Sequence, residues 1–166
     1  MLSVNRKTSL VGLWDEEEFM TAEEFAKQYP VTDRVRVRWG EMDSLGHVNN
    51  VMFFRYFESI RMLYWDLMAE SIRGRVKASI GPILASTQCR YKKPLYYPDQ
   101  IILGTKVTSV QEDRFTMMHA VWSEKEQLIV AEGEGVLVSY DYELKTKVAL
   151  PDAWREFMAA AETHAP

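Results

Sequence analysis

The sequence has one cysteine, three histidines and no long apolar run, and each shortage argues against a class of protein. A single cysteine, Cys89, cannot form an intrachain disulfide framework. Neither an HExxH nor a CxxC pattern occurs, so we expect no metal site. No apolar stretch approaches the ~20 residues that cross a bilayer. The stretch 9-SLVGLW-14 is short and runs straight into 15-DEEE-18, unlike a signal peptide. We therefore expect a cytoplasmic protein that does not bind membranes.

Positive charge is also in short supply, because 24 acidic residues outnumber 20 basic ones and give a net charge of −4. A general affinity for nucleic acid is therefore not expected. The arginines that alternate along 34-RVRVRWG-40 are interpreted as the solvated face of a strand. The chain lacks a GxSxG elbow, a P-loop and a GxGxxG motif. Cys89 lies in the apolar stretch 83-ILASTQCRY-91 and is interpreted as a core residue, not a nucleophile.

The 166 residues suffice for one domain with a sizeable core. Alternating apolar residues predict a strand at 34–40 and further strands at about 82–93, 100–111, 114–124 and 127–141. Only short segments separate the later strands, so we expect them to form antiparallel hairpins. Helices are predicted at about 49–70 and 152–162. This order of elements predicts an α+β fold.

The predicted helix 49–70 carries apolar residues in nearly every direction, which is typical of a buried helix. A sheet that covers such a helix must curve around it. Ala131, Gly133, Gly135 and Leu137 share one face of the last strand, and small residues there would let the sheet approach the helix closely. A curved antiparallel sheet wrapped around a long central helix is the arrangement of the hot-dog fold.

The first 30 residues are interpreted as an N-terminal extension. Thr21 and Glu24 fit a capping box, and Pro30 ends the weak amphipathic helix that follows it. We expect an extension at 1–30, a hot-dog domain at 31–150, and a C-terminal helix and tail at 151–166. The hot-dog domain is expected to fold and to act without residues 1–30.

The stretch 40-GEMDSLGHVNNVMFFRYFESIR-61 places a lone carboxylate, Asp43, just before the long helix. Asn49 is the better candidate for the helix cap, because it adjoins the first apolar turn. The first N–H groups of a helix have no intrahelical partner and can hold a carbonyl oxygen as it becomes an oxyanion. A carboxylate beside them can attack that carbonyl or deprotonate a water. The pattern favours acyl-transfer chemistry, and the alternative is that Asp43 only braces the loop.

The run WGEMDSLGHVNNVMFFRYFESIR resembles the signature of the 4-hydroxybenzoyl-CoA thioesterase family of hot-dog proteins. It is most similar to bacterial acyl-CoA thioesterases whose motif reads D-x-x-x-H-V-N-N before an aromatic-rich helix. The stretch 91-YKKPLYYPDQI-101 supports the match, which spans about residues 34–151. The resemblance implies that Asp43 is the catalytic carboxylate and that His47 and Asn50 belong to the catalytic motif. It also implies that backbone amides polarise the thioester carbonyl, namely those of Asn49, Asn50 and Val51.

Two details of this resemblance remain open at the level of the sequence. A related subgroup carries a histidine where this chain has Asn50, which argues against a histidine-assisted route. His47 matches the motif, and it either braces the loop or contacts the substrate.

The resemblance implies hydrolysis of an acyl-CoA thioester to free acid and CoA, without a cofactor, by a homodimer or homotetramer. The phosphates of CoA need local cations, and the densest cluster is Arg90, Lys92 and Lys93. Candidates for the acyl pocket are Met52, Phe53 and Tyr56. Glu58 is expected to pair with Arg55 or Arg61 on the same helix. The alternatives are a hot-dog dehydratase or hydratase, and a non-catalytic acyl-CoA-binding module.

Overall fold

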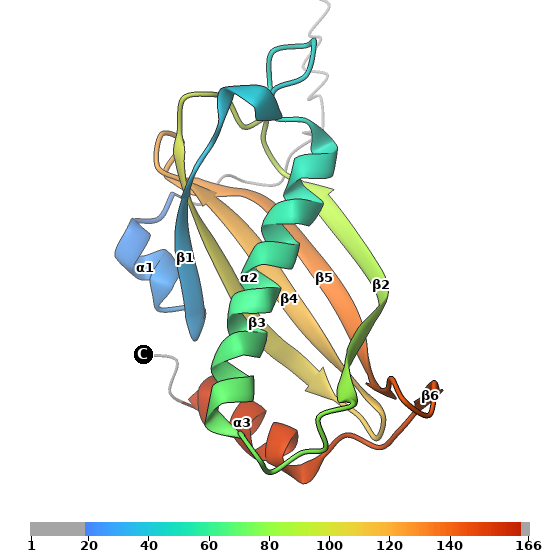
Figure 1. The fold of residues 1–166 in the computed structure, drawn as a ribbon. Helices are drawn as coiled ribbons and strands as arrows, with labels where there is room; N and C mark the ends of the chain where they lie inside the picture. Colours follow the sequence, from blue (N-terminus) through green and yellow to red (C-terminus); the bar gives the residue numbers. More distant parts are fainter. Residues whose placement is uncertain (1–18, 164–166) are drawn as a thin grey trace, which may run out of the picture.

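The computed structural model describes residues 19–163 as a curved sheet with one long helix, α2, lying along its concave face (Figure 1). The helices are α1 (Ala22–Ala26), α2 (Asn50–Ser71) and α3 (Asp152–Thr163), with a short 3₁₀ helix at Trp39–Glu41. The strands are β1 (Val31–Arg36), β2 (Ile80–Tyr91), β3 (Gln100–Val110), β4 (Arg114–Ser123), β5 (Leu128–Asp141) and β6 (Thr146–Lys147). The α+β class and the hot-dog arrangement are thereby confirmed.

All strand pairs are antiparallel, in the order β1-β3-β4-β5-β2, with the short β6 beside β5. The predicted hairpins β3-β4 and β4-β5 are confirmed. The predicted hairpin between β2 and β3 is wrong, because β2 pairs with β5 at the opposite edge from β1. The connection 92–99 passes the start of α2, where the Val48 N–H donates to the Leu95 carbonyl at 2.7 Å. This tie places the end of β2 beside the loop that contains Asp43.

The first strand is shorter than the alternation 34-RVRVRWG-40 predicted. β1 ends at Arg36, and the Arg38 N–H donates to the Glu41 carboxylate at 2.7 Å as the chain turns into the 3₁₀ helix. Trp39 was expected on the buried face with Val35 and Val37, but its side chain is 76% exposed. The local cap overrides the strand periodicity at this point.

Helix α2 begins as predicted, because the Asn49 side chain accepts a hydrogen bond from the Val51 N–H at 3.0 Å. Its buried residues form one stripe that faces the sheet: Phe53, Tyr56, Phe57, Ile60, Tyr64 and Met68. Burial on every side, expected from the sequence, is not found within one chain, since Val51, Met62 and Leu67 are exposed.

The close approach of β5 to α2, expected from its small residues, is confirmed at Gly133. A Cβ atom on this glycine would lie 2.2 Å from Cε2 of Phe57 and 2.8 Å from the Gln88 carbonyl oxygen. Only a residue without a side chain fits between helix and sheet there.

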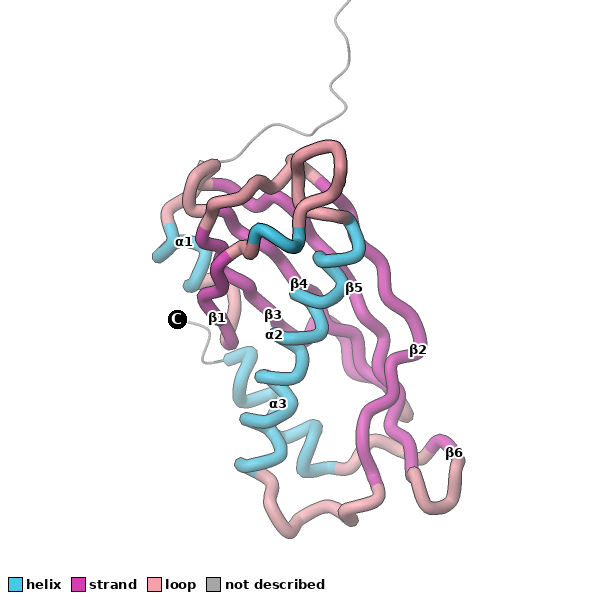
Figure 2. Tube along the Cα trace, turned by 45° about the horizontal axis from the view of Figure 1, so that its top comes forward, coloured by secondary structure: helices cyan, strands magenta, loops and turns pink. Residues whose placement is uncertain are grey.

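Helix α1 packs on the outer face of the sheet, and Figure 2 shows it on the far side of β1 from α2. Thr21 and Glu24 form the predicted capping box. Phe25 is fully buried with Trp122 and Ile102, and the Trp122 indole N–H donates to the Met20 carbonyl at 3.1 Å. The described part of the extension therefore covers the sheet, and folding and activity of the domain without residues 1–30 stay a prediction. Residues 1–18 lie outside the described part of the chain.

At the other end of the chain, α3 forms at the predicted position and closes the core. Trp154 is fully buried and packs edge-on against Trp65 of α2, with ring centroids 5.0 Å apart. Among residues 19–163, no helix is long and apolar enough to span a membrane.

Candidate active site

The loop before α2 is a tight turn that places Asp43 beside His47. Met42 bridges to Val48, and the Asp43 N–H donates to the His47 carbonyl at 2.9 Å. Gly46 has a φ of +83°, a conformation that side chains disfavour, so the glycine in the motif is required by the turn. These bonds hold the Asp43 and His47 side chains on the same side of the loop.

The two oxygens of the Asp43 carboxylate have different surroundings. Oδ1 accepts a hydrogen bond from the Leu45 N–H at 2.8 Å, which braces the loop. Oδ2 lies 3.5 Å from Nδ1 of His47. The side chain is partly exposed, so Oδ2 is accessible to a ligand in the adjoining cavity. One oxygen thus braces the loop, and the other is available for chemistry.

The start of α2 offers fewer free amides than the sequence predicted. The Asn49 N–H donates to the Glu41 carbonyl at 2.9 Å, and the Val51 N–H donates to the Asn49 side chain at 3.0 Å. The Asn50 N–H has no acceptor among the residues that the structure describes. Of the three amides, that of Asn50 is therefore the one that can donate to a ligand.

Asp43, His47 and Asn50 line one open cavity of about 430 Å³, together with Phe53, Tyr91 and Lys93. The structure therefore brings together the three residues expected from the motif. The Asp43 carboxylate supplies a base, the helix N-terminus supplies a donor and positive potential, and Phe53 and Leu95 supply apolar wall.

Tyr91 is a site residue that the sequence did not single out. Its hydroxyl donates to the Asn50 carbonyl at 3.1 Å, and its ring meets Phe53 edge-on with centroids 5.2 Å apart. Burial, helped by Cys89, raises the pKa of this hydroxyl to about 12, so it stays protonated as a donor. Tyr91 opens the second quoted motif, but the pairing of β2 with β5 decides its position over α2.

The predicted cation cluster is divided. Lys93 lines the cavity, while Arg90 and Lys92 do not. The Lys93 ammonium lies 3.3 Å from Glu126, and that of Lys92 lies 2.7 Å from Glu132. Both lysines therefore have acidic partners on the adjoining hairpin in this state.

The residues named for the acyl pocket also separate. Phe53 lines the cavity with Asp43, but Met52 and Tyr56 line a different cavity, between α2 and β1. The Tyr56 hydroxyl donates to the Glu41 carboxylate at 2.7 Å and is buried. Of the three residues named for the acyl pocket, Phe53 alone therefore shares a cavity with Asp43, and the location of the acyl pocket stays a prediction.

Cys89 does not have the properties of a nucleophile. It is half-buried on β2, and burial raises the pKa of its thiol to about 11, so the reactive thiolate is disfavoured at neutral pH. Groups of three or more His, Cys, Asp or Glu that could hold a metal ion are absent from residues 19–163.

Comparison with known proteins identifies the family of this chain. A model of the thioesterase-like superfamily matches residues 37–160, which include the whole cavity around Asp43. The chain belongs to the thioesterase-like superfamily.

Two of the similar proteins are more than 25% identical to this chain over the aligned residues. A thioesterase from Thermus thermophilus, crystallised with coenzyme A and zinc, is 29% identical with a TM-score of 0.70, covering 82% of this chain and 96% of that chain. The protein YsmA of Bacillus subtilis strain 168 is 28% identical over 101 residues, or 59% of this chain. The match spans 65% of the length of YsmA.

A more distant superfamily structure shows the same fold. The DHNA-CoA thioesterase of Staphylococcus aureus has a TM-score of 0.67 at 19% identity, covering 80% of this chain and 88% of that chain. At this identity the likeness shows the hot-dog fold alone.

Proposed function

We propose that this protein hydrolyses an acyl-CoA thioester to a free carboxylic acid and CoA. The observation that carries the proposal is the meeting of Asp43, with one oxygen open to the cavity, and the free Asn50 amide at the start of α2. The D-x-x-x-H-V-N-N motif supports membership of the 4-hydroxybenzoyl-CoA thioesterase family within the superfamily. The coenzyme A bound by the Thermus relative supports a CoA ester as substrate.

Asp43 acts on the thioester by one of two routes, as nucleophile or as general base. As nucleophile, its carboxylate attacks the thioester carbon and CoA leaves as a thiolate that takes up a proton; water then hydrolyses the resulting anhydride. As general base, it takes a proton from a water that attacks the same carbon; the C–S bond then breaks, and CoA leaves as a thiolate that takes up a proton. In both routes the carbonyl oxygen becomes an oxyanion, which the Asn50 N–H and the positive end of α2 stabilise.

The remaining residues of the cavity position the substrate. Tyr91 holds the Asn50 carbonyl and so fixes the first turn of α2. Lys93 lines the cavity and can exchange Glu126 for a phosphate of CoA, with Arg90 and Lys92 further along the same segment. His47 orients the Asp43 oxygen that reacts.

The working form is proposed to be a homodimer, or a homotetramer built from such dimers, joined through β2. Among the residues that the structure describes, this strand pairs only with β5 and leaves its other edge open. Ile83 and Leu84 on it are 39% and 40% exposed, and Met62 of the neighbouring helix is 47% exposed. An open edge with apolar neighbours is the kind of surface that a second strand covers.

The test of the proposed function is Asp43→Asn, assayed with a panel of acyl-CoAs and a thiol reagent. Asparagine keeps the hydrogen bond from Leu45 but has neither charge nor basicity, so kcat should fall by at least ~10²-fold with little change in KM. Folding should persist, because the turn is retained. A stable Asp43→Asn protein with a kcat within about threefold of wild type would contradict the catalytic role of Asp43.

A second candidate function is a non-catalytic acyl-CoA-binding module. The hydrogen bond from the Leu45 N–H to Asp43 favours this alternative, because it gives the carboxylate a structural role in bracing the loop. In that case the wild-type protein binds acyl-CoA without turnover, and any loss in Asp43→Asn follows the thermal stability of the variant. The hydratase alternative is distinguished in the same panel, because it consumes enoyl-CoA without releasing a thiol.

A further inference from the structure

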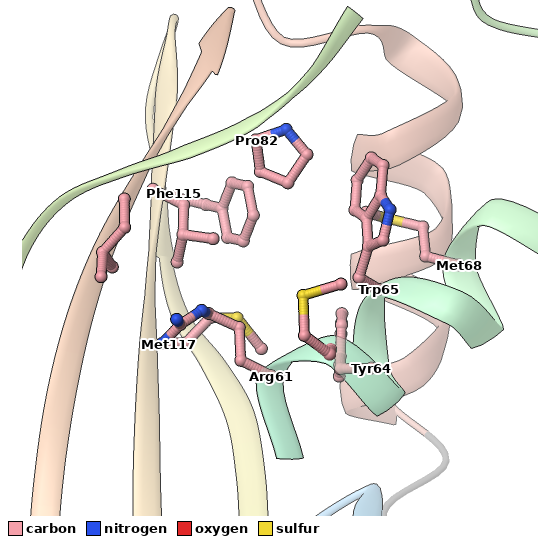
Figure 3. Close-up of a pocket in the computed structure, with 10 residues that line it drawn as sticks. Arg61, Tyr64, Trp65, Met68, Pro82, Phe115 and Met117 are labelled. Atoms are coloured by element: carbon pink, nitrogen blue, oxygen red, sulfur yellow. The ribbon is translucent and has the colours of Figure 1, made fainter. Parts of the chain in front are cut away.

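A separate cavity, of about 130 Å³, lies between the far half of α2 and strands β2, β4 and β5 (Figure 3). Arg61 comes 11 positions after Asn50, which is roughly 16 Å along the helix at 1.5 Å per residue. The walls are largely apolar, with side chains that include Met62, Trp65, Met68, Pro82, Phe115 and Leu137. An engineered apolar cavity of about 150 Å³ binds benzene, so this space suits one ring or a short chain.

Arg61 is the charged residue of this cavity. Figure 3 shows its side chain reaching from α2 toward Met117 on the sheet. Within residues 19–163 it has neither a hydrogen bond nor an ion pair. The expected pairing with Glu58 is absent at contact distance, and the glutamate acts on Arg61 only through its more distant charge. Arg61 is partly buried, and this burial lowers the pKa of its guanidinium.

His119 lies close enough to Arg61 for the two to interact electrostatically, and it carries a neutral acceptor. Its Nδ1 is 2.8 Å from the Thr105 hydroxyl, which is itself 3.0 Å from the Met118 carbonyl. Because the hydroxyl has one proton, both bonds form only if Thr105 donates to Met118 and His119 donates from Nδ1. Nε2 then carries a lone pair, and this buried atom has no partner in the described structure.

The histidine cannot neutralise the arginine. Burial, and then the charge of Arg61, lower the pKa of His119 to about 3, so the ring is uncharged at neutral pH. A guanidinium has five donors, and if one N–H turns to Nε2, a fork remains for a ligand. Arg61 therefore presents hydrogen-bond donors and a positive charge to an apolar cavity.

We propose that this cavity is a binding site for a small apolar carboxylic acid, with Arg61 as the residue that binds the carboxylate. A guanidinium fork matches a carboxylate with two parallel hydrogen bonds. The apolar walls fit a single ring or a short aliphatic chain, which is the rest of such a molecule. The site is distinct from the cavity around Asp43, with which it shares no lining residue.

The proposed hydrolysis releases a molecule of this class, so the site fits the reaction product. This connection rests on the proposed function, whereas binding of the acid does not. A product-binding site would report the level of free acid to helix α2, whose first turn carries the proposed oxyanion donor.

The experiment measures binding of benzoate and of benzamide to the full-length protein by calorimetry, with Trp65 fluorescence as a second readout. The two probes share a ring, and only benzoate is charged. Wild-type protein is expected to bind benzoate at least ~10-fold more tightly than benzamide, about 1.4 kcal/mol. Arg61→Met should remove this preference and leave benzamide binding unchanged. Arg55→Met, on the same helix but outside the cavity, should behave as wild type.

Four outcomes would overturn the proposal. Three concern binding: no saturable benzoate binding, equal affinity for the two probes, or an unchanged preference in Arg61→Met. The fourth is a loss of self-association in Arg61→Met, which would show that the guanidinium contacts a second copy of the chain. Loss of an unpaired buried charge should leave the thermal stability of Arg61→Met equal or higher, so misfolding is separable from lost binding. Asp43→Asn should bind benzoate normally, so failure of the proposed hydrolysis is distinguished from failure of this site.

Discussion

His119 illustrates how the fold sets the chemistry of a single residue. In the sequence it lies on a strand with no neighbouring motif, and we attached no role to it. In the structure its ring stacks on Phe57 at a centroid distance of 5.4 Å, and its side chain is fully buried. Burial between helix and sheet, together with the charge of Arg61, produces a histidine that resists protonation.

This histidine predicts an acid-dependent loss of stability. Its pKa is about 3 in the folded state and about 6.5 when unfolded, so between these values the unfolded chain binds more protons. Its contribution is therefore fully present above pH 6.5 and is lost as the pH falls toward 3, by up to ~1.4 kcal/mol per pH unit. Urea unfolding at several pH values should show this slope in wild type and a shallower one in His119→Gln. Identical pH dependence in both proteins would refute the prediction.

Among the elements, α1 shows most clearly that the outer face of the sheet needs a cover. A Cβ atom on Gly104 would lie 2.6 Å from the Tyr29 ring, so the segment after α1 sits directly on β3. Phe25 and Tyr29 pack together with ring centroids 4.9 Å apart. The segment is thus part of the folded unit, although it precedes the region that resembles the thioesterase family.

Two phenylalanines of this segment provide a matched test. Phe25 is fully buried and Phe19 is 71% exposed. Phe25→Ala should lower the free energy of unfolding by ~3–5 kcal/mol, because it removes a buried ring and leaves a cavity. Phe19→Ala should stay within about 0.5 kcal/mol of wild type. Chemical denaturation followed by tryptophan fluorescence measures both, and equal stability of the two variants would show that α1 is dispensable.

At the scale of the whole molecule, a single chain leaves the edge of β2 and the adjoining face of α2 exposed. Strand β2 has an open edge, and apolar residues of α2 next to it are exposed. The sequence predicts a helix that is apolar nearly all round, and the sheet of one chain covers only one of its faces. A second copy is the simplest way to cover the other.

The prediction is that wild-type protein forms at least a dimer and that Ile83→Lys weakens it. Lysine at an exposed position of a free edge opposes strand pairing between chains. Val110→Lys is the control, because Val110 is 41% exposed but lies at the end of β3, away from that edge. Light scattering after size exclusion should show smaller assemblies for Ile83→Lys only. Monomeric wild-type protein, or an equal effect of both variants, would rule out assembly through β2.

The sequence by itself determined the elements and the core of the candidate site. Helix α2, its Asn49 cap and most strand limits follow from periodicity and capping, which act between residues a few positions apart. Asp43 and Asn50 are only seven positions apart in the chain, so their meeting at the helix start also needed no long-range information. The tertiary structure decided what depends on distant partners. Pairing of β2 with β5 brings Tyr91 over Asn50, and the Glu41 carbonyl engages the Asn49 amide so that Asn50 keeps its N–H free. The sheet likewise decides that Arg61 lines a cavity with Phe115 and Met117, which no local pattern in the sequence records.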